Sequence, residues 1–190
     1  SYCASTYTDE AGGAEYIANV TFNTINNDSE NDLTDGYQDF TSITTSIKRG
    51  NTYQCSVTFD ADDYQDICTV FIDWNNDYVF DEDTEMYQLG VGYGDINTLT
   101  KAITVPDDAA LGNTRMRVNI EYTGDGDASE IGACDSDHQS EWGETEDYAL
   151  MIEDSTASVV DEPFGDFMLF PNPTKGEFTL ALNLISSGKV

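Results

Sequence analysis

The stretch TRMRVNIEY, residues 114–122, alternates apolar and polar side chains. Its apolar members, Met116, Val118 and Ile120, share one face of an extended chain, and Arg115 and Arg117 lie on the other face. Two arginines on one face are conspicuous, because residues 1–154 contain only five basic side chains. The alternation predicts a β-strand whose apolar face packs on a core and whose arginines face the other way.

The same period of two recurs along the chain. Further runs of this kind, separated by Gly, Asn and Asp, are YIANVTFNTI (16–25), NTYQCSVTF (51–59), CTVFIDW (68–74), KAITVP (101–106) and EDYALMI (146–152). No stretch shows a convincing helical period. Short strands joined by polar turns predict an all-β protein, an antiparallel β-sandwich of the jelly-roll or immunoglobulin-like kind with acidic loops at its ends.

A change of pattern after residue 154 predicts a domain boundary. Residues 1–154 form the expected sandwich, and residues 155–163, STASVVDEP, are typical of a linker. Residues 164–190 begin a partial second β-unit, in which the turn PNPTKG (171–176) precedes the alternating run EFTLALNL (177–184). A unit of this size cannot close a core alone, so we expect the chain to continue past Val190 or this segment to dock on a neighbour.

The charge balance excludes several classes of partner. The chain has 37 acidic and 7 basic residues, a net charge of -30, which repels phosphate backbones and anionic lipid surfaces. No run approaches the roughly 18–20 apolar residues of a membrane span, and the first residues lack a basic start and an apolar run. We therefore expect no nucleic-acid binding, no membrane insertion and an export signal that has been removed, with divalent cations or salt offsetting the repulsion.

The four cysteines predict disulfides in an oxidising compartment. No CxxC pair occurs and the chain has one histidine, so a thiolate zinc site lacks both spacing and additional ligands. Three pairings are possible. We favour Cys55–Cys68 and Cys3–Cys134, because the runs around Cys55 and Cys68 resemble adjacent antiparallel strands.

The stretch FIDWNNDYVFDEDTE, residues 71–85, is a candidate calcium loop. Oxygen ligands alternate and are followed by carboxylates, as in calcium loops, at Asp73, Asn75, Asp77, the carbonyl of Val79, Asp81 and Glu85. Two features depart from that pattern: Tyr78 occupies the usual glycine position, and Glu85 comes one residue late. The alternative interpretation is an acidic loop that remains solvated.

Candidate catalytic residues are few. His138 lies among acids in CDSDHQS, and bridged cysteines cannot act as nucleophiles. Carboxylate pairs are uninformative in so acidic a chain, so we expect no enzyme activity. Trp74, Tyr78 and Trp142 lie in or beside polar loops, where they could stack on a sugar or anchor a protein partner. Core burial is the alternative, and alternation with Asp73 favours it for Trp74.

The closing stretch GETEDYAL, residues 143–150, resembles the signature of the GEVED domain family. The pattern YC at 2–3, GYQDFTS at 36–42 and ITVPDDAALGNTRMRV at 103–118 fits the same family, so the resemblance extends over residues 2–153. It implies a noncatalytic accessory module of secreted proteins. The positions that match the family's loop are Asp73, Asn75, Asp77 and Glu85, and those that match its closing motif are Glu144, Glu146 and Asp147. The closing acids would complete a metal shell or pair with Arg115 and Arg117, and we favour ion pairing for at least one of them.

A second resemblance concerns the C-terminal residues. LFPNPTKGEFTL (169–180) is similar to the start of the sorting domain of type IX secretion substrates from Bacteroidetes-type bacteria, with Pro171, Asn172, Pro173 and Gly176 as its characteristic residues. It implies contact with the type IX secretion machinery, followed by release or attachment at the outer membrane and cell surface. The run DST at 154–156 resembles the O-glycosylation motif of these bacteria, with Ser155 as acceptor.

Together these features predict a secreted, calcium-stabilised, noncatalytic binding or adhesion module that recognises extracellular polysaccharide or a surface protein. The alternative is a structural subunit of a surface filament, in which self-association completes the terminal β-unit by strand exchange.

Overall fold

The computed structural model describes residues 1–7, 15–31, 34–123, 132–138 and 140–155. These residues form strands and loops and contain no helix. Strand β8 (Gly112–Tyr122), which contains the stretch 114–122, lies at the middle of one of two sheets. The other strands are β1 (Tyr16–Phe22), β2 (Ile25–Asp28), β3 (Tyr37–Lys48), β4 (Thr52–Asp60), β5 (Gln65–Ile72), β6 (Met86–Tyr93), β7 (Asn97–Thr104) and β9 (Gly143–Glu153).

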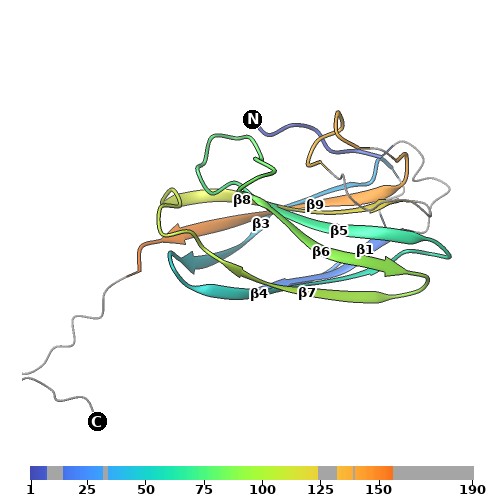
Figure 1. The fold of residues 1–190 in the computed structure, drawn as a ribbon, viewed down its shortest axis with the longest axis horizontal. Helices are drawn as coiled ribbons and strands as arrows, with labels where there is room; N and C mark the ends of the chain where they lie inside the picture. Colours follow the sequence, from blue (N-terminus) through green and yellow to red (C-terminus); the bar gives the residue numbers. More distant parts are fainter. Residues whose placement is uncertain (8–14, 32–33, 124–131, 139, 156–190) are drawn as a thin grey trace, which may run out of the picture. The chain divides into compact units, whose positions relative to one another are not determined.

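Two sheets face one another across the core (Figure 1), which confirms the predicted β-sandwich. One has the strand order β2-β1-β4-β7 and the other β3-β9-β8-β5-β6. Strands β3 and β9 pair in parallel, whereas the sequence predicted antiparallel pairing throughout. Strands β4 to β8 lie between β3 and β9 in the sequence. The chain between them is therefore long enough for the crossover that parallel neighbours require.

The alternation in β8 places its apolar side chains between the sheets. Met116, Val118 and Ile120 are buried there with Val20, Val57 and other side chains of the four-stranded sheet. The other face of β8 is buried as well, since Arg117, Asn119 and Glu121 have at most 1% of their surface exposed. A strand buried on both faces needs a third layer of chain above the sheet.

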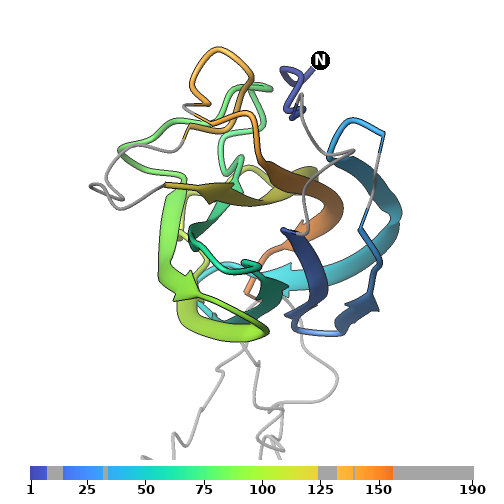
Figure 2. The same cartoon turned by 90° about the vertical axis from the view of Figure 1, so that its right-hand side faces the viewer.

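That third layer consists of three segments on the outer side of the five-stranded sheet: residues 1–7, residues 132–138 and the loop 73–85 (Figure 2). The predicted disulfide Cys3–Cys134 is confirmed and joins two of them. The amide of Asp135 donates to Ala4 O at 2.9 Å, and the amide of Tyr7 donates to Asp35 O at 2.7 Å. The N-terminal residues are therefore a fixed part of the domain.

The second predicted disulfide is absent. Cys55 and Cys68 are free thiols with no exposed surface. Burial raises the pKa of both thiols, that of Cys55 to about 12. The prediction rested on adjacent strands and was wrong on that point, because β4 belongs to the four-stranded sheet and β5 to the five-stranded sheet.

Residues 1–155 form one compact unit. The predicted linker, the unit at 164–190 and the sorting motif lie outside the described residues, apart from the exposed Ser155 at the boundary. In the described part of the chain, no helix is long and apolar enough to cross a membrane.

Glycine is required at the first residue of the GETEDYAL stretch. Gly143 has φ +148°, in a region that residues with a Cβ rarely adopt. A Cβ at this position would overlap Ile120 O and approach the Tyr7 ring to 2.8 Å. Strand β9 can therefore approach β8 beneath Tyr7 only because glycine has no Cβ.

We predict that Gly143→Ala lowers the free energy of unfolding by about 2–6 kcal/mol, the sum of backbone strain and overpacking. Gly112→Ala is the matched control, because Gly112 has φ +111° with no atom within 4 Å of an added Cβ. It should cost only the strain, about 1–3 kcal/mol. Urea unfolding measures both, and equal losses would contradict the steric argument.

Candidate functional site

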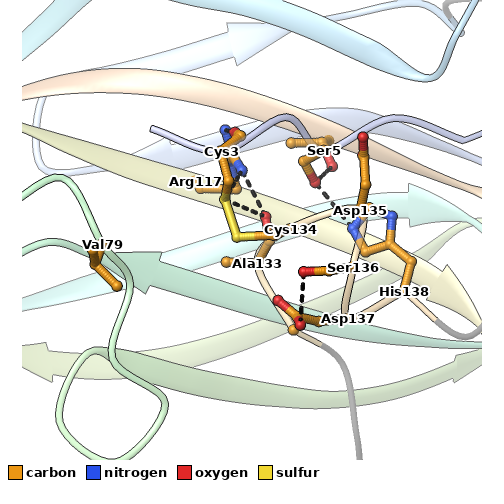
Figure 3. Close-up of a disulfide and its surroundings, with 12 residues drawn as sticks. Cys3, Ser5, Val79, Arg117, Ala133, Cys134, Asp135, Ser136, Asp137 and His138 are labelled. Atoms are coloured by element: carbon orange, nitrogen blue, oxygen red, sulfur yellow. Dashed lines mark hydrogen bonds between the residues drawn. A yellow bond between two sulfur atoms is a disulfide. The ribbon is translucent and has the colours of Figure 1, made fainter. Parts of the chain in front are cut away.

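A buried ion pair lies beneath the N-terminal segment. Arg117 Nε donates to Asp147 Oδ1 and Arg117 Nη2 donates to Oδ2, both at 2.8 Å, and neither side chain has more than 1% exposure. The remaining donors reach backbone carbonyls on either side of the disulfide, Nη1 to Ala133 O at 2.6 Å and Nη2 to Cys3 O at 3.1 Å (Figure 3). The pair therefore fixes the position of the disulfide-linked segments over β8 and β9.

Asp147 also accepts from a second arginine. Arg115 Nη1 donates to Asp147 Oδ2 at 2.9 Å, and a quarter of the Arg115 side chain is exposed. Tyr37 Oη donates to the same oxygen at 3.0 Å. Two guanidinium groups thus share one carboxylate, and the structure places one of the closing acids of the motif between both arginines of β8.

The other two closing acids face away from this pair. Glu144 accepts from the Ile17 amide at 2.6 Å and from Gln38 Nε2 at 2.8 Å. Glu146 accepts from Tyr148 Oη at 2.6 Å. Since successive side chains of a strand alternate in direction, both glutamates lie on the opposite face of β9 from Asp147. Ion pairing, which was favoured for at least one closing acid, is therefore found for Asp147, and these two glutamates face away from the arginines.

Glu146 is buried, and no cation of the described residues pairs with it. It has no exposed surface, and its Oε1 has no hydrogen-bond partner in the described residues. Burial raises its pKa to about 8. The folded protein therefore holds a proton on Glu146 near neutral pH, whereas the unfolded chain releases that proton above the ordinary value of 4.5.

Because of this difference, the contribution of Glu146 to the free energy of unfolding is fully present below pH 4.5. It is lost as the pH rises to about 8, since the unfolded chain releases the proton that the folded chain retains. Glu146→Gln, which keeps the shape of the protonated form, should remove this loss and unfold less readily than wild type at pH 8.5, by on the order of 3 kcal/mol. Thermal unfolding at several pH values measures the effect. Glu153→Gln, at an exposed position of the same strand, is the control, and parallel pH profiles for all three proteins would contradict the assignment.

The loop 73–85 begins with a buried carboxylate. Asp73 has no exposed surface and accepts from the amides of Asp77 and Tyr78 at 3.2 and 3.0 Å. Tyr2 Oη donates to its Oδ2 at 2.7 Å. Burial, together with the Asp73 carboxylate, raises the pKa of Tyr2, so its hydroxyl remains protonated and continues to donate.

The end of the loop is held in the same way. Glu85 Oε1 accepts from the amides of Trp74 and Asn75 at 2.8 and 3.3 Å, and its Oε2 accepts from the amide of Asp81 at 2.9 Å. Burial raises the pKa of Glu85. The amide of Asp77 also donates to Asn75 Oδ1 at 2.9 Å. The predicted ligands are therefore gathered around one loop, where their oxygens accept from backbone amides.

The shape of the loop can be compared directly with the calcium-loop hypothesis. Tyr78 has φ +70°, the left-handed conformation for which calcium loops use glycine, and Asn76 has φ +58°. Among the described residues, no group of three or more His, Cys, Asp and Glu side chains is arranged to hold a metal. The predicted ligands Asp73, Asn75 and Asp77 surround the first turn, while Glu85 contacts amides at its base.

Of the candidate ligand-binding aromatics, only Tyr78 is largely exposed, at 53%. Trp74 is buried in the core, as its alternation with Asp73 favoured, and its Nε1 donates to Tyr87 Oη at 2.8 Å, so it does not offer the surface contact that was the other interpretation. Asp73 is buried too, because the loop folds over the sheet and encloses both faces at this point. Trp142 is half-buried against the Tyr122 ring, at 5.6 Å between centroids.

A groove of about 240 Å³ lies where the loop, the N-terminal segment and the outer face of the sheet meet. Its walls come from Tyr2, from Asn76 and Tyr78 of the loop, and from residues 113–115 of β8, with Thr41 and residues 148–149 also contributing. The Tyr2 ring contacts two of the other lining residues. This ring is 5.4 Å from that of Tyr78, and the Arg115 guanidinium lies 4.6 Å above it.

The sequence did not identify Tyr2, Asn76, Thr41 or Asn113 as site residues. The adjacent Cys3 was the available signal for Tyr2, because its disulfide with Cys134 ties the N-terminus to the sheet. The other three are ordinary polar residues in the sequence. They become neighbours only when the loop closes over β8 and β3.

A serine and the single histidine lie beside the disulfide (Figure 3). Ser5 Oγ is 3.0 Å from His138 Nε2 and 2.8 Å from Thr145 Oγ1. His138 stacks on Tyr7 at 4.4 Å, and burial lowers its pKa. Ser5 is only 1% exposed, so this arrangement fastens the N-terminal segment to β9.

The closing motif, the arginines and the loop all fall within one stretch of the chain that a known family shares. Residues 67–151 match the GEVED domain family. The match begins in β5 and ends in β9, so it includes the loop 73–85, both arginines and Asp147.

Other comparisons give little further information. The search of curated proteins finds no match. One similar solved structure is a family 123 glycoside hydrolase from Clostridium perfringens, described in a study of glycolipid glycan hydrolysis, with 9% identity and a TM-score of 0.36. The alignment covers 63% of this chain and 23% of that one, so this chain spans less than a quarter of the hydrolase's length.

Proposed function

We propose that this domain is a noncatalytic carbohydrate-binding module of a secreted protein, and that the groove beside Tyr78 is its binding site. The observation that carries the proposal is the lining of the groove. Two tyrosine rings stand beside amide, hydroxyl and guanidinium groups in a space of about 240 Å³. A sugar presents the complementary chemistry, since its C–H faces pack on aromatic rings and its hydroxyls bond to polar side chains.

The conformation of Tyr78 supports a functional role. A bulky residue with positive φ is a genuine outlier, which costs on the order of 1–3 kcal/mol, and Asn76 adds a second positive φ two residues earlier. Glycine at position 78 would relieve this strain but would remove the ring from the groove. Strained residues cluster at functional sites, and two of the four described non-glycine residues with positive φ, Asn76 and Tyr78, line the groove.

Export and adhesion form the wider part of the proposal. The Cys3–Cys134 disulfide is typical of proteins that fold in an oxidising compartment. The motif at Pro171, Asn172, Pro173 and Gly176 would direct the chain to type IX secretion. An exposed position outside the cell would bring the groove into contact with extracellular polysaccharide or glycosylated surface proteins.

We also propose that calcium stabilises the loop. Asp73, Asn75, Asp77, the Val79 carbonyl and, at the base, Glu85 would hold it, and hard oxygen ligands of this kind favour calcium. The left-handed Tyr78 gives the first turn the course that calcium loops follow. The ion would offset carboxylate repulsion and hold Tyr78 and Asn76 in place beside the groove.

Calorimetry with calcium and with chelator checks this part of the proposal. A hundredfold excess of calcium over its Kd should add about 2.7 kcal/mol, a rise in Tm of roughly 5–10 °C for a domain of this size. Asp77→Ala should lose most of that rise, while Asp95→Ala, at an exposed position beyond β6, should keep it. An identical Tm with calcium and chelator would remove calcium from the loop.

Glycan binding is tested on an array of neutral and acidic oligosaccharides, followed by titration calorimetry on the best ligand. Tyr78→Gly should weaken binding about tenfold, the loss of about 1.4 kcal/mol of ring contact. Its free energy of unfolding should stay within about 1 kcal/mol of wild type, because the relieved strain offsets the lost contact with Tyr2. Tyr93→Ala removes another exposed ring, at the far end of β6, and should leave binding unchanged. Binding that survives Tyr78→Gly would move the site elsewhere.

A further inference from the structure

We infer that the groove selects a glycan in which one sugar bears a carboxylate, and that Arg115 binds this group. The inference rests on the proposed carbohydrate-binding function and adds the class of sugar. Arg115 is the one cationic residue among those that line the groove.

Arg115 keeps unused hydrogen-bond donors beside the groove. Its Nη1 donates to Asp147 at 2.9 Å, whereas its Nε and Nη2 have no acceptor in the described part of the chain. Arg117, by contrast, uses its donors on Asp147, Ala133 and Cys3. A planar guanidinium with free donors is suited to a carboxylate, since its geometry allows two parallel hydrogen bonds.

The two arginines outnumber the carboxylate with which they pair. Arg115 and Arg117 share the single negative charge of Asp147 in a setting where Arg117 and Asp147 are fully buried. The cluster of these three side chains therefore has one positive charge in excess. Asp73 lies close by, but both of its oxygens already accept hydrogen bonds from Tyr2 and loop amides. The exposed Asp39 interacts electrostatically with Arg115, so a bound carboxylate would have to compete with Asp39 for this guanidinium group.

Arg115 is also held in position before a ligand arrives. Asp147 fixes one end of the guanidinium, and the Tyr2 ring supports it at 4.6 Å. A side chain that is already fixed loses little conformational entropy when a ligand binds. This lowers the free-energy cost of binding. The Tyr78 ring, beyond Tyr2, would then pack on the sugar ring that carries the carboxylate or on its neighbour.

The net charge limits the ligand to few anionic groups. At -30, the domain repels a polyanion until salt screens the repulsion, and the screening length is about 8 Å at physiological ionic strength. One cation in the groove matches one carboxylate. An acidic sugar within an otherwise neutral chain therefore fits better than a fully charged or sulfated polymer.

The test compares matched oligosaccharides that contain one uronic acid, either free or reduced to the neutral sugar, by titration calorimetry on the calcium-loaded protein. Wild type should bind the free acid at least tenfold more tightly, and higher salt should reduce this ratio. Arg115→Gln should abolish the preference while it retains weak binding of the neutral form. Arg115→Lys should keep part of the preference, because it keeps the charge and loses the planar geometry. Lys101→Gln, on β7 of the other sheet, should behave as wild type.

The outcomes separate this inference from the proposed function. Equal affinities of wild type for the acid and the neutral sugar would overturn the role of Arg115 and leave carbohydrate binding intact. Absence of binding to any glycan on the array would overturn both. The comparison of the two ligands on wild type needs no variant, so it remains decisive even where Arg115→Gln fails to fold.

Discussion

A guanidinium group that loses its water on folding must recover an opposite charge and acceptors for its N–H groups from the protein. Arg117 recovers all of these from Asp147 on the neighbouring strand and from the carbonyls of Ala133 and Cys3. Loss of one partner of such a pair costs about 3–5 kcal/mol, because the other charge stays buried alone. The outer face of the five-stranded sheet is therefore tied to the N-terminal segment and to residues 132–138. The disulfide and the stacked Tyr7 and His138 rings join the same segments again.

The groove is a consequence of this covering layer. Once residues 1–7 are fixed, Tyr2 lies over Arg115 and donates to the buried Asp73, which in turn organises the loop 73–85. The loop turns through two left-handed residues and presents Tyr78 and Asn76 beside the N-terminal ring. Tyr2 is connected to the ion pair through Arg115, and Tyr78 is connected to Tyr2 by a ring contact. Side chains held in this way would lower the entropy cost of the binding that we propose.

In the acidic loop, residue spacing predicted a set of calcium ligands but did not predict their contacts. Asp73, Asn75, Asp77 and Glu85 lie in one loop, and their spacing carried no information on what their oxygens contact. In the folded chain they accept from backbone amides, and Asp73 is enclosed together with Trp74. A similar limit applied to the closing motif. Its three acids are adjacent in sequence, yet alternation sends Asp147 to the arginines and the two glutamates to the opposite face.

The sequence by itself determined the features that depend on local period and on residue type. These are the all-β sandwich, the inward apolar face of β8 and its outward arginines, whereas the pairing of Cys3 with Cys134 was only favoured among three possible pairings. Only the tertiary structure decided which sheet each strand joins, because the period of two is the same in either sheet. The free thiols of Cys55 and Cys68 and the parallel pairing of β3 with β9 follow from that assignment. The contact between Tyr2 and Arg115 also depends on the tertiary structure. It joins segments that are far apart in the sequence, and such contacts do not appear in the periodicity of either segment.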